Sequence, residues 1–219
     1  MAALFASVGQ PPDPEARLLG TAAFAPVTRM ELSIGLARRM GRRVPGAPTV
    51  SALIGLMLSG AAVEDPRLRE LVAGDGLSRE AREVWAHLGT RTLVELIRAD
   101  SWGGIAPNRI GGESRDELWS RLLASFARNE VARLRPAPGQ PPLRIDAARF
   151  DEVAPAPLTR ALLRRYRAEG FELVHRWWPT HHSGVMRDRF APSEAAGWIA
   201  ARFAQDPGSG PGSVAGPGK

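Results

Sequence analysis

One uncharged stretch constrains the fold of this chain more than any other feature. Residues 48–63 read PTVSALIGLMLSGAAV, carry no charged side chain, and are apolar on every side of the helix that they predict. A helix that is hydrophobic all round is buried, either in a protein core or in a membrane. About 15 residues rising 1.5 Å each span roughly 23 Å, short of the roughly 30 Å hydrocarbon layer of a bilayer. We therefore expect the central helix of a soluble bundle and no membrane contact.

Small residues mark one face of this predicted helix. Ser51, Gly55 and Ser59 recur every four residues, so they lie one above another along the helix. Membrane helices use similar rows of small residues for close packing. The serines and the amphipathic segments on both sides favour the soluble interpretation, with the tightest helix contact at this face.

The composition excludes several kinds of chemistry. The chain has no cysteine, so disulfides, thiolate zinc sites and cysteine nucleophiles are ruled out. Its first 20 residues lack the basic start and long apolar run of a secretory signal, so we expect a cytoplasmic protein. No pattern indicates a cofactor.

The charge balance points to an anionic partner. The formal net charge is +6, and such a surplus suggests nucleic acid or an acidic surface. Lys219 is the only lysine, so arginine supplies every other basic side chain. A GC-rich genome produces the same arginine bias without selection for binding, and this alternative stays open.

The order of the segments predicts a mainly α fold, with a helical bundle around the buried central helix and a small C-terminal α/β unit. The expected parts are a flexible arm (residues 1–16), a helical domain (17–135), a proline-rich linker (136–143), the α/β unit (144–205) and a disordered tail (206–219).

Two capping boxes predict where helices begin. In TRME, the Thr28 hydroxyl can accept from a free backbone N–H while the Glu31 side chain reaches back to the cap residue. Leu32, Leu36 and Met40 then recur every four residues, which predicts a buried stripe. A second box, SRDE from Ser114, predicts the start of another helix.

Four arginines gather at the end of the first predicted helix and form the leading candidate for phosphate contact. They are Arg38, Arg39, Arg42 and Arg43. Cations at a helix C-terminus are favoured by the helix dipole, which is the structural alternative. Four arginines exceed what a helix end requires, so the cluster also suits phosphate or an acidic protein.

The C-terminal unit offers a second basic surface. A basic helix over residues 157–169 precedes a predicted strand over 171–178, and residues 184–190 are expected to return as its partner. This outline is winged-helix-like, with Arg164, Arg165 and Arg167 on phosphate or bases and Arg176 on the wing. A short helix is expected over 144–150. In the alternative interpretation, this unit only packs against the bundle.

Residues 101–112, SWGGIAPNRIGG, are the most loop-like internal stretch. Exposed backbone N–H groups there could hold an anion, with Trp102 filling the core beneath the loop. No phosphate-loop fingerprint is present.

Three histidines lie close to one another in the C-terminal part of the chain, namely His175, His181 and His182. No acidic residue stands at a usual metal-ligand spacing from them, so no metal site is predicted.

Three functions remain from the sequence. The leading one is a non-enzymatic nucleic-acid-associated role carried by the two arginine clusters. The second is a protein-interaction or assembly subunit, including a homo-oligomer, without nucleic-acid contact. The third is an enzyme with a site at the 101–112 loop, although no catalytic residue is assigned.

Overall fold

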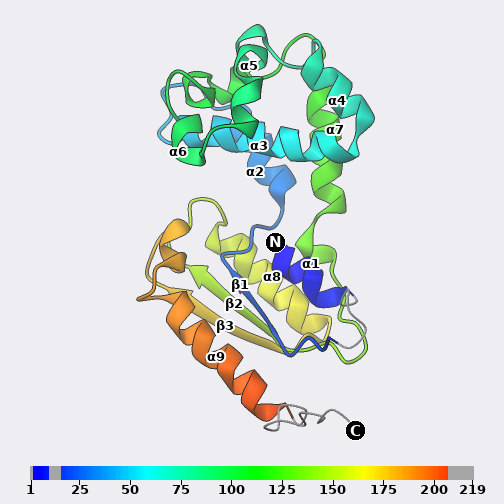
Figure 1. Ribbon diagram of the computed structural model, residues 1–219, viewed down its shortest axis with the longest axis vertical. Helices are drawn as coiled ribbons and strands as arrows, with labels where there is room; N and C mark the ends of the chain where they lie inside the picture. The colour runs from blue at the N-terminus through cyan, green and yellow to red at the C-terminus, as the bar shows by residue number, and fades with distance from the viewer. Residues whose placement is uncertain (1, 10–15, 207–219) are drawn as a thin grey trace, which may run out of the picture. The chain divides into compact units, whose positions relative to one another are not determined.

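The computed structural model describes residues 2–9 and 16–206, which form two compact units (Figure 1). The helical unit comprises Arg29–Glu130, and the α/β unit comprises the chain up to Thr28 and from Val131 onward. A mostly helical chain with a small three-stranded parallel sheet agrees with the expected mainly α class. The tail expected over 206–219 lies outside the described residues except for Asp206.

The helical unit is built around α3 (Ala47–Glu64), which coincides with the uncharged stretch. The other helices are α2 (Met30–Ala37), α4 (Pro66–Ala73), α5 (Arg79–Glu83), α6 (Leu93–Leu96) and α7 (Arg115–Arg128). Short 3-10 turns occupy Trp85–Gly89, Trp102–Gly104 and Pro107–Arg109. By length and composition α3 could cross a membrane, yet Ile54, Leu58 and their neighbours pack it into the core of this unit.

The small face of α3 packs against an aromatic ring. Gly55 is buried, and a Cβ added there would lie 2.7 Å from the ring of Trp102. Ser51 is also buried, and its hydroxyl donates to the Ile105 carbonyl oxygen at 2.6 Å. Trp102 is fully buried beneath its loop, as expected. The small side chains therefore let the 101–112 loop pack closely against α3, whereas the sequence led us to expect another helix at this face.

The start of α2 differs from the prediction. The helix begins at Met30 after Arg29, which has a left-handed backbone (φ 55°) and makes no side-chain cap, so the Thr28 capping box is wrong. Leu32 and Leu36 are 51% and 72% exposed, whereas Ile34 is buried. Because Ile34 lies two residues from each leucine, it occupies the opposite side of the helix and turns the leucines outward.

The second predicted helix start is confirmed, but the Ser114 hydroxyl does not make the predicted capping hydrogen bond. Helix α7 begins at Arg115, directly after Ser114. The Ser114 hydroxyl donates to Asp75 Oδ2 at 2.7 Å and makes no cap hydrogen bond. A complete capping box instead joins Thr92 and Glu95 at α6. A capping sequence locates the boundary, while the tertiary neighbours decide which oxygen the hydroxyl meets.

The α/β unit contains a parallel sheet in the order β1-β2-β3. The strands are β1 (Thr21–Phe24), β2 (Leu143–Ala148) and β3 (Leu173–Trp178), and the helices are α1 (Ala2–Val8), α8 (Ala156–Ala168) and α9 (Ala191–Gln205). Leu143 and Ile145 of β2 pack with Leu162 and Tyr166 of α8. Ala148 packs on the other side with Ala191 of α9, so helices flank both faces of the sheet (Figure 1).

Three local expectations for this unit are replaced. Residues 144–150 were expected to be helical but contain most of β2, the central strand. The hairpin prediction is wrong because β3 pairs with β2 in parallel, and Ser183–Met186 is a 3-10 helix. The winged-helix outline therefore loses its antiparallel ribbon. At the other end of the chain, α1 occupies much of the segment where a loose arm was expected, with Leu4 fully buried.

A buried ion pair places two charged side chains on the central strand, β2. Arg144 and Asp146 are both buried on one face of the sheet, and the guanidinium donates to both carboxylate oxygens at 2.7 and 2.9 Å. The indole N–H of Trp178 donates to Asp146 at 2.9 Å. Arg144 also lies 3.4 Å from Glu194 of α9. Charge pairing thus permits two ionic side chains on a strand that is buried on both faces.

Candidate functional site

The arginines after α2 present unpaired positive charge on the helical unit. Arg39, Arg42 and Arg43 are exposed, and their side chains have no ion-pair or hydrogen-bond partner among the described residues. Arg38 closes α2, and its Nε is buried without a hydrogen-bond partner in the same set. Three guanidinium groups are therefore available to an external anion at this end of the helix.

A cavity of about 400 Å³ joins this segment to the 101–112 loop. Its lining residues are Gly41, Arg42, Glu80, Gly104, Ile105, Ala106, Asn108 and Arg109. The Asn108 backbone N–H donates to the Met40 carbonyl oxygen at 3.2 Å, which ties the loop to the arginine segment. Arg109 pairs with Glu80 at 3.5 Å, so the lining retains one uncompensated positive charge, that of Arg42.

The 101–112 loop, which lines the cavity, is packed against α3 and the preceding turn. Trp102 is buried against Gly55, and His87 Nδ1 lies 2.9 Å from the hydroxyl of the buried Ser101. At Gly103 and Gly104 a Cβ would collide with backbone carbonyl oxygens of residues 97 and 99. The backbone therefore passes so close to the preceding turn that only glycine fits, which fixes the loop as part of the scaffold.

The predicted arginines of the α/β unit are mostly engaged in local pairs. Arg165 pairs with Glu169 at 3.6 Å, and Arg176 pairs with Glu194 at 3.1 Å while its guanidinium stacks over a tryptophan ring. The Arg167 guanidinium lies 2.8 Å from a histidine ring nitrogen. Arg164 is exposed and has no side-chain partner among the described residues. This cluster offers less uncompensated charge than the arginines after α2.

The histidine that meets Arg167 is held neutral. Burial, and next the positive charge of Arg167, lower the pKa of His175 from its ordinary 6.5. A neutral ring can accept the guanidinium N–H. The pair therefore adds no second positive charge to β3.

The carboxyl ends of β2 and β3 bring together Asp151, which sequence reasoning missed, and His182, which it considered only as a metal ligand. The Asp151 side chain is 1% exposed and lies 2.9 and 3.0 Å from His182 Nδ1 through its two oxygens. It also accepts from the backbone N–H groups of Val153 and Ala154 at 2.9 and 2.6 Å. Ligands of open α/β sheets bind at this edge, outside the carboxyl ends of the strands.

The protonation of this pair follows from its contacts. The hydrogen bond to Asp151 raises the pKa of His182, and partial burial opposes it. Burial alone would raise the pKa of Asp151, but the bonds from His182 and from two backbone amides outweigh it and lower that pKa. The carboxylate thus stays ionised and holds Nδ1 protonated, which leaves His182 Nε2 to exchange a proton. No group of three metal-ligating side chains occurs in the described ranges.

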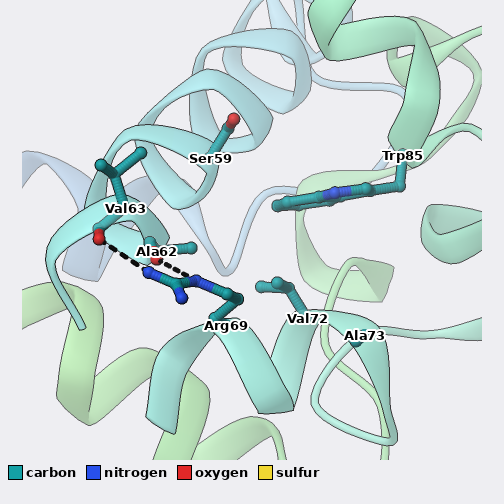
Figure 2. A pocket seen from close by; sticks show the side chains of 7 residues that line it. All are labelled: Ser59, Ala62, Val63, Arg69, Val72, Ala73 and Trp85. Carbon is teal, nitrogen blue, oxygen red and sulfur yellow. Dashed lines mark hydrogen bonds between the residues drawn. The ribbon is translucent and has the colours of Figure 1, made fainter. Parts of the chain in front are cut away.

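A second cavity, also of about 400 Å³, lies between the end of α3, α4 and the turn at Trp85 (Figure 2). Its lining residues are Ser59, Ala62, Val63, Arg69, Val72, Ala73 and Trp85. Arg69 donates to the carbonyl oxygens of Ala62 and Val63 at 3.1 and 2.8 Å. Ser59, Ala62 and Val63 belong to the uncharged stretch, but no sequence motif predicted a cavity here.

Together these features define a mainly helical protein with a small parallel α/β unit and three exposed arginines after α2. We find no match to the chain among protein-family models, curated proteins or solved structures.

Proposed function

We propose that this protein binds nucleic acid, without catalysis, through the arginine surface of its helical unit. This surface consists of Arg39, Arg42, Arg43, Asn108 and Arg109, from the segment after α2 and from the 101–112 loop. The observation that carries the proposal is the exposure of three arginines with no acidic partner among the described residues. We place this activity in the cytoplasm and assign it no membrane partner and no cofactor.

The chemistry of phosphate recognition supports this choice. A guanidinium presents a planar fork of donors that matches two phosphate oxygens, and neutralising phosphates releases counterions. Arg42 lines a cavity that is also lined by Asn108, a residue type that can hydrogen-bond base edges. The closely packed 101–112 loop holds the backbone of Asn108 at the cavity before any ligand binds, which lowers the ordering cost for that side of the site.

Salt-dependent binding tests the proposal. Fluorescence anisotropy with a labelled single-stranded and a labelled duplex oligonucleotide, at salt concentrations from about 50 to about 200 mM, should show affinity that falls steeply as salt rises. The double variant Arg42→Ala, Arg43→Ala should bind more weakly at low salt. Its slope of log K against log salt should be flatter by about one for each phosphate that no longer has an arginine beside it.

The matched control is Arg79→Ala, which removes an exposed arginine that pairs with Glu83 on the same unit. This variant should keep the affinity and the salt slope of the unaltered chain. Salt-insensitive self-association that is unchanged when Arg42 and Arg43 are replaced would instead support the protein-assembly role.

A second candidate function rests on the pair Asp151–His182. A buried carboxylate that orients a partly exposed imidazole is the arrangement of a general acid–base site. Incubation of the same oligonucleotides with the unaltered chain and with His182→Gln tests this candidate. Cleavage that is lost in the variant supports it, and the absence of any cleavage that depends on His182 removes it for this substrate class.

A further inference from the structure

The second cavity of the helical unit combines an apolar wall with one cationic group. Ala62, Val63, Val72 and Ala73 supply aliphatic surface, and the indole of Trp85 supplies an aromatic face. Figure 2 shows the indole reaching into the cavity from one side and the guanidinium of Arg69 lying on the other. The volume lies within the range of small-molecule sites and the lining is mostly apolar, while Val63 and Arg69 at its edge are exposed to solvent.

Arg69 keeps much of its donor capacity. A guanidinium carries five N–H donors, and its bonds to Ala62 and Val63 use one on Nε and one on Nη2. Both acceptors are neutral carbonyl oxygens at the end of α3, and no carboxylate pairs with Arg69 among the described residues. The helix dipole at the end of α3 offsets part of the charge, roughly half of one unit. The remainder faces a cavity with no anion of its own.

The orientation of the Trp85 indole is fixed by a contact with a second tryptophan. The Trp85 ring meets the ring of Trp102 edge to face, with centroids 6.1 Å apart and planes inclined by 62°. Trp102 is fully buried, so this contact anchors the indole from the core side. A flat apolar group can therefore stack in the cavity without first ordering the tryptophan, which avoids an entropic cost of binding.

We infer that this cavity binds a small aromatic carboxylate or sulfonate, with its ring against Trp85 and its anionic group on Arg69. The aliphatic and aromatic lining favours an anion with an apolar ring over a hydrated inorganic one, and the arginine favours an acid over its neutral amide. The site is separate from the arginine surface, because the two cavities share no lining residue. Ligand binding in this cavity can therefore be tested independently of nucleic-acid binding.

Calorimetry with 2-naphthoate tests this inference, with 2-naphthamide as the uncharged analogue. The full-length chain should bind 2-naphthoate saturably at one site and bind the amide about tenfold or more weakly, since hydrogen bonds to charged groups are the stronger ones. Arg69→Gln should remove this preference for the acid, whereas Arg79→Gln should keep it. Oligonucleotide binding should be unchanged in both variants.

A steric variant keeps the inference testable if Arg69→Gln loosens the end of α3. Ala73 is exposed and lines the cavity, so Ala73→Trp fills the space without entering the core. This variant should melt like the unaltered chain and lose 2-naphthoate binding. Three results would each overturn the inference: no saturable binding, equal affinity for acid and amide, or full affinity in Ala73→Trp.

Discussion

The contact between Gly55 and Trp102 supports a quantitative prediction about the helical core. In Gly55→Ala the new Cβ would lie 2.7, 2.8 and 2.9 Å from Cδ2, Cε2 and Cε3 of the Trp102 ring. Carbon atoms in ordinary contact are separated by about 3.5–4.0 Å. Because Trp102 is fully buried and its loop is tied to α3, the ring cannot move aside freely. The methyl group must therefore strain the packing.

Two opposing terms set the size of the effect. Overpacking a well-packed core costs about 1–3 kcal/mol. Replacing glycine by alanine inside a helix stabilises it by about 1 kcal/mol. The net loss for Gly55→Ala is therefore between about 0 and 2 kcal/mol. Gly60 lies in the same helix with nothing within 4 Å of an added Cβ, so Gly60→Ala should stabilise by up to about 1 kcal/mol.

The difference between the two variants isolates the packing term, because both gain the same helix propensity. Urea denaturation followed by circular dichroism should show Gly55→Ala less stable than Gly60→Ala by about 1–3 kcal/mol at unchanged m-value. Gly55→Leu should lose more than Gly55→Ala. Equal midpoints for the two alanine variants would refute the close packing of Gly55 against Trp102.

Two further predictions concern the α/β unit. Asp146→Ala removes the closer of the two carboxylates beside the buried Arg144 and leaves only Glu194 at 3.4 Å, so it should cost up to about 3–5 kcal/mol in urea denaturation. A double change of Arg144 and Asp146 to apolar side chains should cost much less. Equal losses would contradict a tightly coupled pair. His182 has a folded pKa above 6.5, so its contribution to stability is present below pH 6.5 and is lost as the pH rises through the folded value. Asp151 has a folded pKa below 3.8, so its contribution is present above pH 3.8 and is lost as the pH falls. The melting temperature of His182→Asn should therefore fall furthest below that of the unaltered chain between about pH 4 and 6, and a gap that stays constant to about pH 9 would count against this ion pair.

Features that depend on local pattern were predictable from the sequence. The uncharged stretch became α3, because a run that is apolar on all sides can only be buried. The helix after Ser114 begins where its capping sequence predicts, and Trp102 fills the core beneath its glycine-rich loop. The exposed arginines after α2 were also visible, since a charge cluster beside a glycine and a proline is local information.

Features that depend on distant partners were decided only by the tertiary structure. The prediction of a helix over 144–150 missed β2, because the pairing of Arg144 with Asp146 in the buried sheet leaves no trace in a single sequence. Parallel pairing of β2 with β3 then placed the loops after both strands at one edge, where Asp151 meets His182 across 31 residues of chain. Backbone hydrogen bonds create this proximity, and backbone groups are the same in every residue. The sequence by itself therefore determined which segments are buried and which carry charge, while the fold decided which of those charges are paired.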